Sequence, residues 1–346
     1  MTSEMIIRCL VPWLGSKRTL GEDIVTELGA HTHYVEPCCG SMAPLLVKKP
    51  SQKETANDLH GDLTNLAYVV QDFAAAVPLY ERLCQVVMSE QLLDEARERL
   101  VEMTWPSVDE PPATRFLATD EMVDRAYWYF LASWMGRNGT AGCDRTDYQL
   151  AVRWTKSGGS PTVRFRNAVR SIPAWHERLQ NVVIMRRDFF RFLDRLEDDP
   201  GTAIYFDPPY PAETRSSIND EGTASAAGGG GCYLHELSHA DSSKDAASLF
   251  GSSTWFGDWK KTLEAREKGA RVDEHRLAAE ILKSYKRARI VVSSYDCERY
   301  RQLYAGWTFI DKSRQKHLHA MNGRGRRPKL APEVLIVNGP SFAETH

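Results

Sequence analysis

Five short apolar, β-rich runs punctuate the sequence, and each ends at a polar or turn-forming residue. The runs are Tyr34–Val35, Val182–Met185, Ala203–Phe206, Ile290–Val292 and Val334–Val337. Runs this compact are typical of strands that are buried on both faces of a sheet. Amphipathic segments at 62–73 and 275–285 lie between them. Strands that alternate with helices predict an α/β fold.

Acidic residues follow three of these runs. Glu36 begins the turn that contains Gly40, Asp188 follows the second run, and Asp207 follows the third. Asp58 lies about 20 residues beyond the first turn, a spacing at which an acid commonly binds ribose hydroxyls. Because α/β proteins bind ligands at the carboxyl ends of their strands, these acids predict one nucleoside-binding crevice.

Asp207-Pro208-Pro209-Tyr210 carries the most specific chemistry. The two prolines fix φ, so they stiffen the turn and aim its carbonyl groups. A carboxylate and a backbone carbonyl can accept both hydrogens of an exocyclic amine, while tyrosine stacks on the flat base that bears it. The alternative is a proline-rich turn that simply ends a strand.

These residues resemble the Dam-like (α-group) N6-adenine-specific DNA methyltransferases. The segments that look like the family's motifs are Pro12–Lys17, Tyr34–Ser41, Asp207–Tyr210, Tyr233–Leu237, Val292–Asp296 and Arg326–Asn338. The resemblance implies a Rossmann-like S-adenosylmethionine-dependent methyltransferase sheet with helices on both faces. It also implies a small, mostly helical target-recognition domain at 79–178. The catalytic domain would comprise 1–78 and 179–346, with a loop insertion at about 213–272.

The same resemblance assigns the site residues and the cofactor. S-adenosylmethionine is the implied methyl donor and S-adenosylhomocysteine the product, with no metal. The implied catalytic residues are Asp207, Pro208, Pro209 and Tyr210. The implied cofactor contacts are Trp13, Lys17, Glu36, Pro37, Gly40, Asp58, Asp188 and Asp207. Met42 departs from the family, which usually has a small residue there, and it predicts a wider or more apolar loop.

Charge along the chain indicates where DNA would bind. The formal net charge is −2, from 44 basic and 46 acidic residues. This total conceals two basic stretches, 137–178 with eight bases against three acids and 312–329 with seven bases and no acid. The expected contacts to double-stranded DNA are Arg137, Asn138, Arg153, Arg164, Arg166, Arg324, Arg326 and Arg327. The alternatives are plain surface charge for the first stretch and a solvated hairpin tip for the second.

The function implied is site-specific transfer of a methyl group to the N6 amine of a flipped-out adenine in DNA. A cognate restriction or defence system is a further expected partner. The alternatives are an N4-cytosine DNA methyltransferase, an RNA adenine methyltransferase and a catalytically silent DNA-binding homologue. Met42 leaves the last of these open.

Other patterns in the sequence bear on metal binding, disulfide bonds and cellular location. His235-Glu236-Leu237-Ser238-His239 matches a zinc protease motif, but the neighbouring glycines and serines disfavour the helix that this motif needs. Seven cysteines without a Cys-x-x-Cys pair argue against a disulfide scaffold. The sequence shows neither a signal-peptide pattern nor a stretch of about 20 apolar residues. We therefore expect a cytoplasmic protein without a membrane partner.

Overall fold

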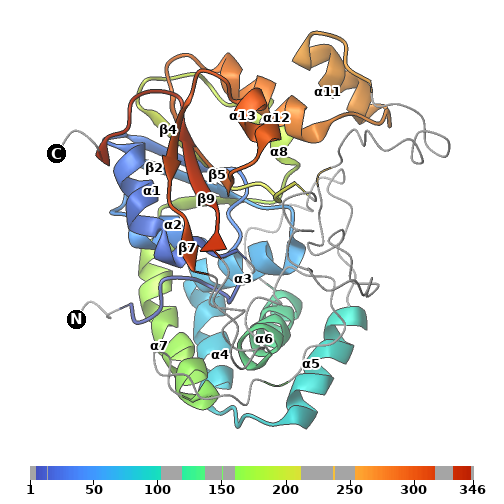
Figure 1. Cartoon of the computed structure of the whole chain (residues 1–346). Coiled ribbons are helices and arrows are strands. Elements are labelled where there is room, and N and C mark those ends of the chain that lie inside the picture. Colours follow the sequence, from blue (N-terminus) through green and yellow to red (C-terminus); the bar gives the residue numbers. More distant parts are fainter. Residues whose placement is uncertain are drawn as a thin grey trace, which may run out of the picture. The chain divides into compact units, whose positions relative to one another are not determined.

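The computed structural model describes residues 5–13, 15–102, 119–136, 150, 160–211, 237, 254–315 and 330–343. Contacts divide these residues into two units. Figure 1 colours the chain by residue number, from blue at the N-terminus to red at the C-terminus. The first unit holds the described residues of 1–25 and 32–189. The second holds those of 26–31, 190–230 and 235–346.

Three parallel strands form the base of the first unit. They are β1 (His33–Glu36), β2 (Lys53–Asn57) and β3 (Val182–Met185). β2 lies in the middle, because it pairs with β1 on one side and with β3 on the other. In this register Glu36 lies beside Ala56, and Asn57 beside Met185. The loops that follow the three strands therefore start from one edge.

Helices make up most of the rest of the first unit. They are η1 (Lys17–Thr19), α1 (Gly21–Leu28, whose last turn belongs to the second unit), α2 (Ala43–Val47), α3 (Gly61–Gln71), α4 (Phe73–Cys84), α5 (Glu90–Glu102), α6 (Asp120–Met135) and α7 (Pro161–Leu179). α3 packs against α4, α6 and α7, and α6 lies between α4 and α5 (Figure 1). Side-chain oxygens of Asp72, Thr119 and Ser160 cap the N-termini of α4, α6 and α7. Local sequence therefore sets where these helices begin.

A mixed set of strands forms the second unit. The strands are β4 (Thr202–Phe206), β5 (Arg289–Tyr295), β6 (Thr308–Asp311) and β9 (Glu333–Val337). β4 is parallel to β5, and β9 runs antiparallel between β5 and β6. A separate antiparallel pair joins β7 (Arg314–Gln315) to β8 (Leu330–Ala331). This pair brackets the basic segment 316–329.

The described helices of the second unit are α8 (Phe189–Asp194, whose first residue belongs to the first unit), α11 (Trp259–Glu267), α12 (Glu274–Ser284) and α13 (Glu298–Leu303). α12 confirms the amphipathic segment predicted at 275–285, since Leu277 and Ile281 on one face are buried. Asp258 and Asp273 cap the N-termini of α11 and α12. α11 falls within the predicted loop insertion, so part of that insertion is helical.

All five predicted runs are strands, but two details were wrong. β5 continues through Ser293 and Ser294 to Tyr295, because it keeps pairing with β9 along this length. β3 is not buried on both faces, since Val183 is 57% exposed. β3 pairs with β2 on one side, so its position is that of an edge strand. β2 and β6 were not predicted as strands.

Helices that alternate with parallel strands confirm the predicted α/β class. The predicted recognition domain at 79–178 covers the second half of α4, all of α5 and α6, and α7 except its last residue, Leu179. These elements are helical, as expected of that segment. Its boundaries and its role in target recognition stay predictions.

Candidate active site

The N-terminal segment that carries Trp13 is fastened to two helices of the first unit. The indole of Trp134 donates to the carbonyl of Leu10 (3.0 Å), and that of Trp175 donates to the carbonyl of Ile7 (2.7 Å). The Leu10 N–H donates to the carbonyl of Ser41 (3.0 Å). The segment is thus tied both to α6 and α7 and to the glycine loop that follows β1.

Gly40 meets the Trp13 ring closely. It adopts φ +44°, a conformation that L side chains rarely take. A Cβ atom at this position would lie 2.9 Å from Nε1 of Trp13. Glycine is therefore required here, because any side chain would displace either the indole or the loop.

Asp58 joins the glycine loop to the start of α3. Its Oδ2 accepts from the N–H of Gly40 (2.8 Å) and its Oδ1 from the N–H of His60 (2.9 Å). Burial raises the pKa of Asp58, while the hydrogen bonds from His60 and Gly40 oppose that rise. A carboxylate has about four acceptor positions. These two bonds therefore leave Asp58 able to accept further donors.

Asn57 was not identified from the sequence, although it links the loops after two strands. Its Nδ2 donates to the carbonyls of Pro37 (2.8 Å) and Arg187 (3.0 Å), and its Oδ1 accepts from the N–H of Arg187 (2.9 Å). Asn57 is 1% exposed. Most of the residues that precede Asn57 in β2 have little strand preference, so the sequence carried little signal for this role.

The other predicted cofactor contacts also lie in the first unit. Glu36 is buried and accepts from the hydroxyl of Tyr34 (3.0 Å). Lys17 is buried in η1, and its Nζ donates to the carbonyl of Gly15 (2.8 Å). Asp188 is half-buried after β3. The structure thus places these residues at the N-terminal segment and at the strand ends of one unit.

His60 adds aromatic surface beside these residues. Its ring lies 5.6 Å from that of Trp13, edge to face, and 5.5 Å from that of Tyr129 on α6. Its Nδ1 accepts from the N–H of Leu63 and caps α3. One residue therefore both starts a helix and supports the Trp13 ring.

Asp207 follows β4 in the second unit and is half-buried. Its Oδ1 accepts from the hydroxyl of Ser293 on β5 (2.7 Å). The Ser293 hydroxyl also lies 2.8 Å from the hydroxyl of Tyr205. No role was predicted for Ser293, although a polar residue directly after a buried-strand pattern was a usable signal.

Tyr210 is held by contacts from two other strands of the second unit. Its hydroxyl donates to Oε2 of Glu333 on β9 (3.0 Å). Its ring packs edge to face on Tyr295 of β5, with centroids 4.9 Å apart. Burial, followed by the neighbouring Glu333 carboxylate, raises the pKa of Tyr295 to about 12. Pro208 is buried and Pro209 half-buried, so this turn is well supported.

Two of the predicted DNA contacts lie on α7. Arg166 is exposed and Arg164 is half-buried. In the described part of the chain, Nε and Nη2 of Arg164 are buried without a hydrogen-bond partner. Burial, followed by the nearby Arg18 charge, lowers the pKa of Arg164. The other predicted contacts lie outside the described residues: Arg137, Asn138, Arg153, Arg324, Arg326 and Arg327.

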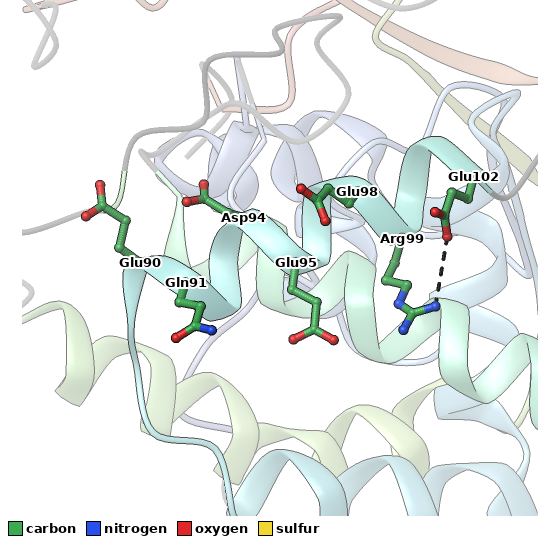
Figure 2. Close-up of a pocket in the computed structure, with 7 residues that line it drawn as sticks. All are labelled: Glu90, Gln91, Asp94, Glu95, Glu98, Arg99 and Glu102. Carbon is green, nitrogen blue, oxygen red and sulfur yellow. Dashed lines mark ion pairs between the residues drawn. The ribbon is translucent and has the colours of Figure 1, made fainter.

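A recess of about 690 Å³ follows the exposed face of α5, and none of its lining residues is a predicted site residue (Figure 2). Its lining residues are Glu90, Gln91, Asp94, Glu95, Glu98, Arg99 and Glu102. Five carboxylates there repel a phosphate, and Arg99 is paired with Glu102 (3.9 Å). The negative charge of this recess therefore argues against a nucleotide or DNA site, despite its volume.

The zinc-motif residues His235, Glu236 and His239 lie outside the described residues. Within the part that the structure does describe, no group of three or more metal-ligating side chains occurs. No helix in that part is long and apolar enough to span a membrane.

Comparison with known proteins gives one clear similarity. A family model described as D12 class N6 adenine-specific DNA methyltransferase matches residues 13–226. The match includes every predicted cofactor contact and the whole of Asp207–Tyr210. A search of curated proteins found no match.

Proposed function

The chain belongs to the D12 class N6 adenine-specific DNA methyltransferase family, and from this we propose which residues bind the cofactor, the target adenine and the DNA. The protein transfers a methyl group to the N6 amine of adenine in DNA. This family assignment favours adenine over the cytosine and RNA alternatives, and an active enzyme over a silent homologue. The roles of individual residues, the cofactor and the mode of DNA binding are the proposals that follow.

We assign S-adenosylmethionine to the first unit. When bound, this cofactor supplies an electrophilic methyl group on a sulfonium centre. Two observations support the fit. Gly40 packs its backbone directly against the Trp13 ring, which keeps the glycine loop and this predicted contact together. Asp58 keeps acceptor capacity beyond its two backbone bonds and can receive ribose hydroxyls.

The remaining cofactor contacts have complementary chemistry. Glu36 and Asp188 are acceptors at strand ends, suited to hydroxyl or amino groups of the ligand. Lys17 offers a cation for a carboxylate, and Pro37 fixes the backbone after Glu36. Asp207, in the second unit, is assigned to the cofactor as well, from its place in the family's catalytic tetrapeptide.

Asp207 and the carbonyl of Pro208 bind the target amine in this proposal. The adenine amine is a poor nucleophile, because its lone pair is delocalised into the ring. Hydrogen bonds to two acceptors favour a pyramidal nitrogen whose lone pair can attack the methyl group. The protein then acts mainly by alignment and polarisation. Pro209 keeps the turn rigid.

Tyr210 stacks on the adenine after it leaves the duplex. Extruding a paired base costs a few kcal/mol. Stacking on an aromatic ring returns about 1–3 kcal/mol of this cost.

Double-stranded DNA is held by the segment 79–178 and by the basic segment between β7 and β8. Arg166 is exposed on α7, as a phosphate or base contact requires. Nε and Nη2 of Arg164 have no hydrogen-bond partner among the described residues, and such donors favour an anionic ligand. We further propose that the protein acts in the cytoplasm, beside a cognate restriction or defence system.

The single observation that carries the catalytic assignment is Asp207-Pro208-Pro209-Tyr210 directly after β4, in a chain of this family. The test is Asp207→Ala, assayed with tritiated S-adenosylmethionine and unmethylated genomic DNA. We expect methyl transfer to fall below detection, while calorimetry finds cofactor affinity within a few-fold of the wild type.

Asp58→Ala is the matched control, since it removes a carboxylate assigned to the cofactor and should abolish cofactor binding. Loss of cofactor binding in Asp207→Ala at an unchanged melting temperature would contradict these roles. Identifying the modified nucleoside in digested DNA as N6-methyladenine checks the target atom.

A further inference from the structure

The buried hydroxyls of Ser293 and Tyr205 form a chain of hydrogen bonds that ends at Asp207 in the second unit. Strands β4 and β5 are parallel, and Phe206 is paired with Val292. The next position in this register sets Asp207 beside Ser293. Because side chains alternate along a strand, Tyr205 and Asp207 project to the same face of β4. The strand register therefore brings all three side chains together.

The hydrogen bonds among these groups have one direction. Ser293 Oγ donates to Oδ1 of Asp207 (2.7 Å) and lies 2.8 Å from the Tyr205 hydroxyl. A serine hydroxyl has one hydrogen. Since Ser293 gives that hydrogen to Asp207, the hydroxyl of Tyr205 must be the donor to Ser293. The chain therefore runs from Tyr205 through Ser293 to the carboxylate.

Because these hydrogen bonds are buried, they restrain the Asp207 carboxylate strongly. Ser293 is 0% exposed and Tyr205 is 1% exposed, so water does not compete for either hydroxyl. Hydrogen bonds to an ionised acceptor are shorter and stronger than neutral ones. Donation from Tyr205 polarises the Ser293 hydroxyl further.

We propose that Ser293 is a positioning residue for Asp207 and that Tyr205 supports it. The hydroxyl of Ser293 fixes Oδ1, which sets the plane in which the carboxylate meets the target amine. Neither hydroxyl touches substrate in this proposal. It rests on the assignment of Asp207 to the target amine made above.

The test compares Ser293→Ala, Ser293→Thr and Tyr205→Phe with the wild type, using tritiated S-adenosylmethionine and unmethylated genomic DNA. Misplacing a reacting group by about 1 Å can cost about 100-fold in rate. We expect Ser293→Ala to lower kcat about 10- to 100-fold, with KM for DNA and cofactor affinity within twofold. Tyr205→Phe should lower kcat a few-fold, and Ser293→Thr should restore most of the activity because it keeps the hydroxyl.

Ser294→Ala is a matched control one residue away in the same strand. Ser294 is equally buried, but its hydroxyl has no hydrogen-bond partner within the described structure. Its removal should leave kcat unchanged and should not lower the melting temperature. A general sensitivity of β5 to lost hydroxyls would instead reduce kcat in both alanine variants alike.

The positioning role of Ser293 and the proposed function can fail separately. A wild-type protein that methylates no DNA would contradict the proposed function itself. An active wild type with kcat unchanged in both Ser293→Ala and Tyr205→Phe would overturn the positioning role alone. If Ser293→Ala melts well below the wild type, Tyr205→Phe decides, because it leaves Ser293 in place.

Discussion

Met42 has a backbone conformation that a methionine rarely adopts. It has φ 56° and ψ 26° directly before α2, and among the described residues it is the one non-glycine residue with positive φ. Its side chain is fully buried. The left-handed conformation costs a residue with a Cβ about 1–2 kcal/mol. Burial of the side chain offsets this cost, so the departure from the family's small residue gives an apolar loop.

Replacing Met42 separates these two effects. Met42→Ala loses the buried side chain and keeps the strain, and such truncations cost about 2–5 kcal/mol. Met42→Gly loses the same side chain but relieves the backbone strain. Its free energy of unfolding should therefore be about 1 kcal/mol higher than that of Met42→Ala. Urea unfolding of both variants measures this difference. Greater stability of the alanine variant would contradict the left-handed backbone at this position.

Tyr210 combines a ring with an anchored hydroxyl, and two substitutions distinguish them. Tyr210→Phe keeps the ring but loses the bond to Glu333, so methyl transfer should fall by less than about fivefold. Tyr210→Ala removes the ring, and loss of about 1–3 kcal/mol of stacking predicts roughly a 5- to 150-fold rise in KM for DNA. Steady-state kinetics at saturating cofactor measures both. Equal losses in the two variants would assign the role to the hydroxyl instead of the ring.

At the scale of elements, a buried group of charges joins α2, β2 and α7. Glu54 on β2 pairs with Lys48 at the end of α2 and with Arg178 on α7 (2.5 Å to Oε2). Burial opposes ionisation of Glu54, but hydrogen bonds from Arg178 and Lys48 outweigh it and lower its pKa. This group lies near the amino ends of the parallel strands, since Glu54 is aligned with Tyr34 of β1 and Val182 of β3.

The pKa of Glu54 predicts an acid-sensitive fold. Its folded value lies below the ordinary 4.5, so its contribution to stability is fully present above that pH. The contribution is lost as the pH falls through the folded value. Removing one partner of a buried ion pair costs about 3–5 kcal/mol, so Glu54→Gln should be destabilised by that amount at pH 7. The gap to the wild type should narrow below about pH 4.5.

Urea unfolding at pH 7 and pH 4 measures this change. Glu267→Gln is a suitable control, because its pair with Arg191 is partly exposed and should be worth less than about 1 kcal/mol. A constant gap between Glu54→Gln and the wild type across this pH range would argue against the shifted ionisation of Glu54.

At the scale of the whole molecule, a net charge of −2 hides regions of opposite sign. The outer face of α5 is acidic and unsuited to DNA (Figure 2). The basic segment 316–329 is closed at both ends by the β7–β8 pair. This arrangement fits either a phosphate-binding loop or a solvated hairpin, and the salt dependence of DNA binding distinguishes them.

Replacing Arg326 and Arg327 by alanine should weaken binding to all DNA sequences alike. Each lost phosphate contact lowers the slope of log affinity against log salt by about 1, so the double variant should lose about 2. Fluorescence anisotropy at several salt concentrations measures the slope. Arg99→Ala removes a charge from the acidic face of α5 and should leave the slope unchanged. An unaltered slope in the double variant would support the solvated hairpin.

The sequence by itself determined the α/β class and the positions of the strand-end acids. Both follow from local patterns, because buried strands need continuous apolar runs and ligand-binding acids stand where those runs end. The tetrapeptide at Asp207 was recognisable for the same reason. The exposed face of β3 and the length of β5 were not, since both depend on which strand lies alongside.

Only the tertiary structure decided which side chains hold these residues in place. Ser293 lies 86 residues from Asp207, Glu333 lies 123 from Tyr210, and Asn57 lies 130 from Arg187. Strand register brings such partners together, and no local pattern encodes register between distant strands. A buried hydroxyl or amide keeps its place only where the fold supplies a partner, so the supports of this site emerge from packing.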